Sequence, residues 1–203
     1  SELSTLEWDQ TKILIDDWIP YNMLMSFVGQ EPMSDIRVSA TLTPVANTLT
    51  ARFTLEANGM RFVWLLSSNN ASLVLSSIGG DLIQNVEIPC KGLEAGEPLR
   101  VEFWHVDQMM SMYVNGEKLG ELLYDFGPEQ RIRLATGSGP SVPIEDIAGM
   151  GGTPAKLLWQ FDGSPLNITR LQVDHDLYYR SSRLPSRATK NPTSAGNEQL
   201  VEI

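Results

Sequence analysis

The two histidines are the residues of this chain most able to act as a general acid or base, because imidazole titrates near neutral pH. His105 follows Trp104 near the end of an expected strand, and His175 stands between Asp174 and Asp176. A Ser-His-Asp hydrolase would also need a nucleophile on a sharp turn, and the sequence contains no G-x-S-x-G motif. Both histidines lie in strand-like patterns, so we expect structural or surface roles for them and predict no catalytic residue.

Acidic residues offer a second kind of chemistry. Neighbouring side chains of a strand point to opposite faces, so Asp174 and Asp176 share a side that His175 does not. Two carboxylates are a weak calcium signal, as is the pair Glu145-Asp146, and a charged rim on the last strand is the better interpretation. Sandwich-fold glycosidases carry carboxylates across a cleft, and their Glu-x-Asp-x-x-Glu strand pattern is absent. We predict no metal site and no cofactor, and a secreted glycosidase is the weakest functional hypothesis.

Tryptophan is the third candidate, because flat aromatic faces stack on sugar rings. The five tryptophans are Trp8, Trp18, Trp64, Trp104 and Trp159. Trp64 lies in FVWLL and Trp159 in LLWQF, where apolar neighbours favour packing in the core. If the domain binds glycans, Trp64, Trp104 and Trp159 are the in-strand candidates for that site.

Composition limits the classes of partner. The chain has 203 residues, a formal net charge of −10 and a pI near 4.6, which argue against nucleic acid because phosphate binding needs clustered Lys and Arg. Cys90 is the only cysteine, so no intramolecular disulfide can form. No apolar run approaches the ~20 residues of a membrane span. Hydrophobic residues make up 42% of the chain, enough for one well-filled domain.

Period-2 alternation supplies the elements that must position any site. The run 99–122 reads as three strands joined by two tight turns, and Asn115-Gly116 is the strongest short-range signal for a hairpin. We expect no amphipathic helix of three or more turns. Residues 137–154 should form a long loop, and a polar linker should begin at residue 181. The other expected strands cover 36–42, 51–57, 61–66, 72–78, 84–88, 131–135, 155–161 and 168–179.

Two of these stretches resemble known families. VEFWHVDQMMSMYVNGEKL resembles the late strand meander of the concanavalin A-like lectin/glucanase (laminin G-like) superfamily. ITRLQVDHDLYYR resembles the final strand of a lectin-like domain inserted in large bacterial type I signal peptidases of the S26 serine/lysine family. The resemblance covers 36–179 and implies that the catalytic serine and lysine boxes lie outside this chain. No Ser-x-Met-x-Pro or Gly-Asp-Asn motif occurs here, so these residues should have no peptidase activity.

Together these observations predict an all-β fold, an antiparallel two-sheet β-sandwich of the concanavalin A-like jelly-roll type. Residues 1–30 form an N-terminal connection and first edge strand, 31–180 the sandwich, and 181–203 a flexible linker. The two ends of the folded core should lie side by side, as an inserted domain requires. Tyr178 and Tyr179 should then place one ring on each face of the sheet.

The resemblance further implies a non-catalytic accessory domain of a membrane-anchored signal peptidase. Its partners would be the parent peptidase domain and a polypeptide or a glycan, with no nucleic acid and with membrane contact only through the parent. It would lie outside the cytoplasm, on the periplasmic side of the membrane. The alternative is a free-standing carbohydrate-binding, lectin-like module.

Overall fold

The computed structural model describes residues 3–9, 12, 16–17, 31–32, 34–147 and 155–175 of the chain. These residues form thirteen strands and two short helices. The strands are β1 (Ser4–Glu7), β2 (Asp16–Asp17), β3 (Glu31–Pro32), β4 (Ile36–Pro44), β5 (Thr50–Ala57), β6 (Met60–Leu66), β7 (Asn70–Ser77), β8 (Leu82–Pro89), β9 (Leu99–Val106), β10 (Met109–Val114), β11 (Glu117–Leu123), β12 (Lys156–Asp162) and β13 (Leu166–His175). The helices are α1 (Pro128–Thr136) and α2 (Ile144–Ile147).

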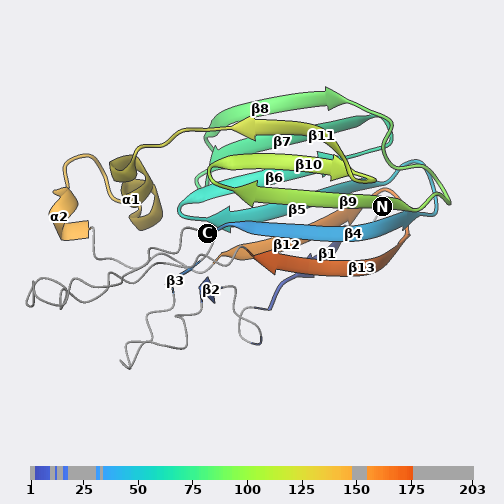
Figure 1. Ribbon diagram of the computed structural model, residues 1–203, viewed down its shortest axis with the longest axis horizontal. Coiled ribbons are helices and arrows are strands. Elements are labelled where there is room, and N and C mark those ends of the chain that lie inside the picture. Colours follow the sequence, from blue (N-terminus) through green and yellow to red (C-terminus); the bar gives the residue numbers. More distant parts are fainter. Residues whose placement is uncertain are drawn as a thin grey trace, which may run out of the picture.

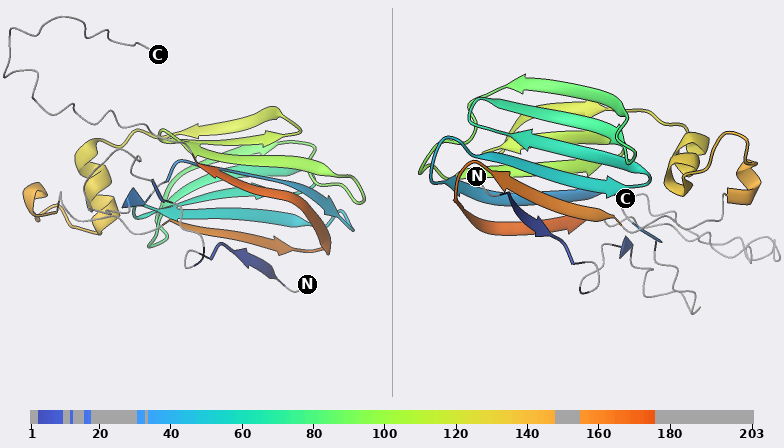
Figure 2. Two further views of the ribbon diagram at one scale, coloured as in Figure 1. Left: turned by 60° about the horizontal axis from the view of Figure 1, so that its bottom comes forward. Right: turned by 180° about the vertical axis from the view of Figure 1, so that it is seen from behind.

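Two antiparallel sheets pack face to face, as Figures 1 and 2 show. The six-stranded sheet has the order β1-β12-β5-β6-β7-β8, and the five-stranded sheet has the order β11-β10-β9-β4-β13. The strands β2 and β3 pair separately. The predicted all-β, two-sheet antiparallel sandwich of jelly-roll type is therefore confirmed. No helix among the described residues is long and apolar enough to cross a membrane.

Aromatic side chains from both sheets meet in the core. The rings of Phe53 and Phe103 stack across the interface with centroids 5.4 Å apart, and Trp64 and Trp159 pack against both of them. These residues sit at alternate positions of their strands, so their neighbours point to the outer faces. The strand alternation seen in the sequence therefore separates one shared interior from two distinct outer surfaces.

Tight turns with left-handed backbone join the hairpins, as their sequences predict. Asn115 and Gly116 have φ values of 50° and 85°, and Asn58 and Gly59 have values of 52° and 76°. Asp107, which begins the β9–β10 turn, also has a positive φ, of 49°. Positive φ at both central residues is the type I′ pattern that matches the twist of antiparallel strands.

One predicted strand is wrong: residues 131–135 lie in helix α1. Pro128 stands at the first turn, and Gly137 adopts the left-handed conformation (φ 65°) that ends the helix. The Gly137 N–H donates to the Leu134 carbonyl, and the Ser138 N–H donates to the Arg133 carbonyl. Proline at the start and glycine just after the end are the local signals that outweigh the short alternation of apolar residues.

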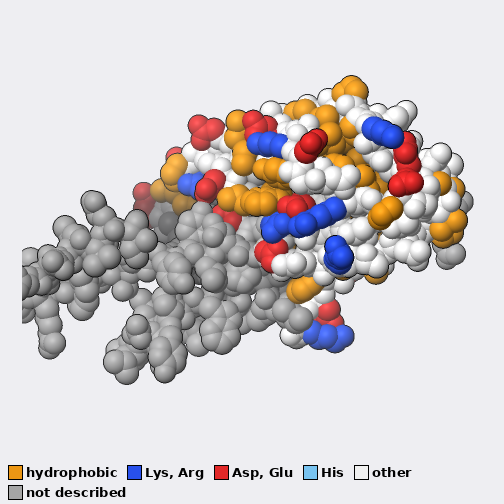
Figure 3. All heavy atoms as spheres, turned by 45° about the vertical axis from the view of Figure 1, so that its right-hand side comes forward, with side chains coloured by type: hydrophobic (Ala, Val, Ile, Leu, Met, Phe, Trp, Pro, Cys, Tyr) orange, Lys and Arg blue, Asp and Glu red, His pale blue; other side chains and the backbone are white. Residues whose placement is uncertain are grey.

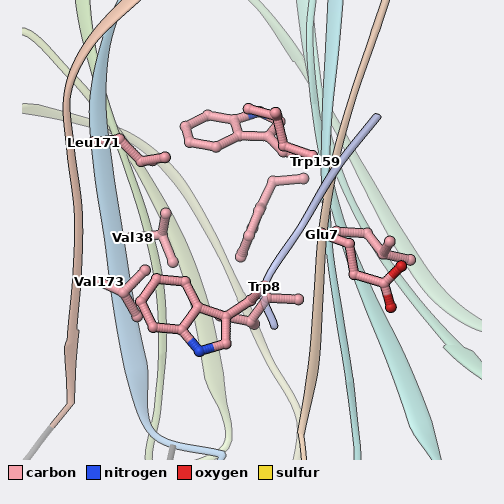
Figure 4. Close-up of a pocket in the computed structure, with 10 residues that line it drawn as sticks. Glu7, Trp8, Val38, Trp159, Leu171 and Val173 are labelled. Carbon is pink, nitrogen blue, oxygen red and sulfur yellow. The ribbon is translucent and has the colours of Figure 1, made fainter. Parts of the chain in front are cut away.

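The two lateral edges of the sandwich differ. Strands β8 and β11 lie close together at one edge, where a side chain on Gly120 would collide with Ile88. At the other edge, β1 and β13 leave a narrow apolar slot of about 70 Å³, which Trp8 and Leu171 line from opposite sheets (Figure 4). At this edge β1 pairs with β12.

The core also begins and ends at neighbouring positions. Ile36, at the start of β4, is the Cα partner of His175, at the end of β13. Residues 36–175 therefore begin and end side by side, but the first strand of the sheets, β1, pairs with β12 and not with the last strand, so the prediction that the first sheet-forming residues lie beside the last strand is wrong for β1. Tyr178, Tyr179 and the linker 181–203 lie outside the described residues.

Candidate functional site

The structure separates the three tryptophans that the sequence offers as candidates for a glycan site. Trp64 is fully buried, and its indole N–H donates to the Ser111 carbonyl at 3.0 Å. Trp159 is 3% exposed and lines the interior slot between β1 and β13 (Figure 4). A glycan on either outer face cannot reach these two rings. Trp104 points outward from β9 and is half-buried, so it is the one of the three that can contribute to a surface site.

Strand register brings charged and aromatic side chains around Trp104 on the outer face of the five-stranded sheet. Arg37 of β4 lies directly across from Trp104, and Tyr113 of β10 lies directly across from Glu102 of β9. We call this group the Trp104 surface; it comprises Arg37, Arg100, Glu102, Trp104, Tyr113 and Asp174. Figure 3 shows basic, acidic and apolar side chains intermixed on this side of the molecule.

A nearly buried carboxylate is at the centre of this surface. Glu102 is 7% exposed and accepts hydrogen bonds through one oxygen from the Arg37 Nε at 3.0 Å and the Trp104 Nε1 at 3.2 Å. Its other carboxylate oxygen meets the Arg100 Nη2 at 3.1 Å. A charge held this far from water needs such partners, because an unpaired buried carboxylate is strongly unfavourable. The carboxylate thus gathers two guanidinium groups and one indole around itself.

The aromatic part of the surface is built on the same contacts. The Arg37 guanidinium carbon lies 5.2 Å from the centroid of the Trp104 ring, a cation–π distance, and the Tyr113 ring lies 5.4 Å away with a tilt of 45°. Both rings are half-buried, so each is fixed in place and still offers part of its surface to solvent. Together they form a short aromatic platform bordered by charged groups.

The last strand completes the border. The Oδ2 atom of Asp174, in β13, lies 3.5 Å from Arg37 Nη1. The Oδ1 atom of Asp174 accepts a hydrogen bond from Gln172 Nε2 at 2.6 Å. The sequence suggested Asp174 either as half of a weak calcium pair or as part of a charged rim, and in the structure it forms an ion pair with Arg37. Within the described ranges, no three acidic, His or Cys side chains are close enough together to hold a metal ion.

The two histidine hypotheses have different outcomes. His105 points inward from β9, is 2% exposed and is hydrogen-bonded to the Ser34 carbonyl and the Tyr124 hydroxyl. It has no serine nucleophile among these partners, in line with the structural role expected for it. The side chain of His175 lies outside the described parts of the chain.

The sequence contains a signal for part of this site. Arg100, Glu102 and Trp104 alternate along a single strand, so they necessarily share one face. Arg37 and Tyr113 could not be added from the sequence, because their places beside Trp104 depend on the pairing of β9 with β4 and with β10.

Comparison with known proteins gives little beyond the geometry. No protein-family model and no curated protein match the chain. Similar solved structures include galectin LEC-6 of Caenorhabditis elegans, 12% identical, covering 70% of this chain and 83% of that one with a TM-score of 0.44. A tetrameric galectin from the ball sponge Cinachyrella sp. is 11% identical, with coverages of 86% and 99% and a TM-score of 0.45. Carbohydrate-binding module CBM66 from Bacillus subtilis is 7% identical, with coverages of 70% and 76% and a TM-score of 0.43.

Proposed function

We propose that this chain is a carbohydrate-binding, lectin-like module that holds a glycan on the Trp104 surface. The observation that carries the proposal is the fixed platform of Trp104 and Tyr113 beside the buried Glu102 carboxylate and its two arginines. Sugar rings present apolar C–H faces and hydroxyl groups together. The platform matches the first by stacking, and the guanidinium groups match the second by donating hydrogen bonds.

The electrostatics of the surface favour a neutral glycan. Arg37 and Arg100 carry two positive charges, and Glu102 and Asp174 carry two negative charges that face them. An anionic ligand would compete with these carboxylates for the arginines. Hydroxyl groups can bind beside the ion pairs without breaking them, because they both donate and accept hydrogen bonds.

Three alanine variants, one of them a control, test the proposal. Arg37→Ala and Trp104→Ala remove parts of the Trp104 surface, whereas Arg52→Ala removes an exposed arginine from the outer face of the six-stranded sheet. Calorimetric titration measures the binding of a panel of neutral oligosaccharides and polysaccharides to each variant. We expect at least one glycan to bind, with affinity reduced about tenfold or more in the first two variants, as for loss of about 1.4 kcal/mol, and unchanged in the third. Absence of binding to the whole panel, or unchanged binding by both Trp104→Ala and Arg37→Ala, would overturn the proposal.

We also propose, as a second candidate, that the domain is an accessory insert of a membrane-anchored signal peptidase on the periplasmic side of the membrane. The observation that supports insertion is limited to residues 36–175, whose ends pair through Ile36 and His175, because a host protein tolerates a segment whose ends are adjacent. This candidate concerns the place of the domain and is compatible with glycan binding.

The complete gene product tests this second candidate. We expect serine and lysine peptidase boxes and a membrane-spanning segment in the sequence that flanks the domain, and a coding sequence without them would contradict it. Protease treatment of intact spheroplasts tests the location, since a periplasmic domain is digested from outside.

A further inference from the structure

A polar pocket of about 200 Å³ lies at one end of the sandwich, away from the Trp104 surface. The β5–β6 turn contributes Asn58, the β9–β10 turn contributes Gln108, and helix α1 contributes Arg131. Figure 1 shows α1 at the same end of the sandwich as these two turns. His105 also lines this pocket although it follows Trp104 in β9, because neighbouring residues of a strand point to opposite sides.

Helix α1 is fitted closely against the pocket wall. A Cβ on Gly59 would lie 1.8 Å from the Leu134 carbonyl oxygen, so the helix backbone approaches the turn as near as glycine allows. Leu134 also packs against the hydrophobic core. This contact fixes the helix that carries Arg131, and it gives the pocket a defined third side.

The hydrogen-bonding roles of His105 and Tyr124 follow from their partners. The His105 Nδ1 lies 2.6 Å from the Ser34 carbonyl oxygen, which can only accept, so Nδ1 carries the proton. The unprotonated Nε2 therefore accepts from the Tyr124 hydroxyl, also at 2.6 Å. Burial lowers the pKa of His105 to about 4, so this arrangement holds at neutral pH. The Tyr124 hydrogen is committed, and its oxygen can only accept a hydrogen bond from a ligand in the pocket.

The rest of the lining supplies both donors and acceptors. The Gln108 side-chain oxygen accepts from the Phe126 N–H at 2.8 Å, so its NH₂ group is the part left for a ligand. Arg131 adds guanidinium donors, and Asp35 and Asp107 add carboxylate acceptors. A simple anion would meet the two carboxylates, and a simple cation would meet the guanidinium. A neutral molecule rich in hydroxyl groups satisfies both kinds of group at once.

We propose that this end pocket binds a single sugar ring or a compact polyol. The Tyr124 and Asp35 oxygens would accept hydrogen bonds from its hydroxyls, and Gln108 and Arg131 would donate to them. The pocket is smaller than the ~300–1,000 Å³ of common small-molecule sites, which excludes an extended oligosaccharide from its interior. The proposal stands apart from glycan binding on the Trp104 surface, because the two sites share no residue.

Two nearly isosteric variants test the end pocket. Tyr124→Phe removes the hydroxyl oxygen and keeps the ring, and Gln108→Glu keeps the acceptor for the Phe126 N–H while replacing the NH₂ donor by an oxygen. The measurement is amide chemical-shift mapping of the whole chain with D-glucose, D-galactose, N-acetylglucosamine and myo-inositol as probes, with thermal unfolding to confirm that each variant is folded. Ethylammonium and acetate serve as the charged comparison probes.

We expect at least one neutral probe to shift the amides of the two turns and of α1 in a saturable way. Tyr124→Phe and Gln108→Glu should each weaken that binding about tenfold, while Trp104→Ala leaves it unchanged. Failure of the Trp104 surface alone would leave these shifts intact, so the two proposals fail separately. No saturable shift with any neutral probe, binding of ethylammonium or acetate alone, or wild-type affinity in both pocket variants would overturn the proposal.

Discussion

Both outer faces of the sandwich are formed by the outward positions of alternating strands, but the two faces carry different kinds of side chain. On the six-stranded sheet every aromatic residue belongs to the core, and the outward positions are mainly small, aliphatic or singly charged, with Val63 and Val74 at the centre. On the five-stranded sheet, Trp104 and Tyr113 point outward beside a nearly buried carboxylate. Core packing requires apolar residues on the inner face alone, so the outer aromatics and the buried charge of the five-stranded sheet are not needed for folding. That difference singles out one face as the candidate site.

A pair of tryptophan variants should give the largest contrast between interior and outer face. We expect Trp64→Ala to lower the free energy of unfolding by about 3–5 kcal/mol, because it leaves a cavity among Phe53 and Phe103. Trp104→Ala should cost about 1 kcal/mol, since its ring is already partly in water. Urea denaturation measures both, and equal costs would show that Trp104 is a core residue.

A pH titration should separate the inner side of β9 from its outer face. His105 has an ordinary pKa near 6.5 in the unfolded chain, and burial lowers it to about 4 in the folded protein. Between these two pKa values the unfolded state binds more protons than the folded state. The contribution of His105 to the free energy of unfolding is therefore complete above pH 6.5 and is lost as the pH is lowered towards 4. We expect about 3 kcal/mol to be lost over this window through His105 alone. His105→Gln, compared with wild type at each pH by urea denaturation, should remove this component; identical slopes would contradict the assignment.

Alanine substitution of one glycine in a hairpin turn of each sheet compares how tightly the two turns are packed. Gly59 and Gly116 both have positive φ, so alanine is strained at either site, and we expect Gly116→Ala to cost about 1 kcal/mol. Gly59→Ala should cost more, about 2–3 kcal/mol, because its new Cβ must also displace the Leu134 carbonyl of α1. Thermal unfolding measures both variants. A smaller loss for Gly59→Ala than for Gly116→Ala would mean that α1 does not rest on the β5–β6 turn.

The smallest expected change in stability comes from two carboxylate variants, one on each outer face of the sandwich. Glu102→Gln removes a charge held by two arginines, and Glu56→Gln removes one on the opposite face, which is paired with Arg61 at 2.7 Å. We expect a loss of about 1–2 kcal/mol for Glu102→Gln, because its arginines are partly in solvent, and under about 0.5 kcal/mol for Glu56→Gln. Similar values by urea denaturation would remove the energetic distinction between the two faces.

Much of the fold could be predicted from the sequence because its signals are local. Alternation along 99–122 and the turn residues Asn115-Gly116 specify the β9–β10–β11 meander, and the structure has those strands within one or two residues of their expected ends. Helix α1 differs from the strand predicted at 131–135, because the signals of Pro128 and Gly137 at its ends outweigh the short apolar alternation between them. The pairing of β4 with β13 brings the ends of residues 36–175 together, whereas the pairing of β1 with β12 could not be predicted from local signals.

The candidate site was predicted far less completely. Residue type alone suggested Trp64, Trp104 and Trp159 together, and alternation alone could not say which face of each strand would be covered by the second sheet. The pairing of β4, β9 and β10 decided that Arg37, Trp104 and Tyr113 meet, since these residues are distant in the chain. The sequence by itself determined the strands, their turns and the two-faced character of each strand. Only the tertiary structure decided which face became interior and which charges met around Trp104, because these depend on contacts between strands and not on local backbone preference.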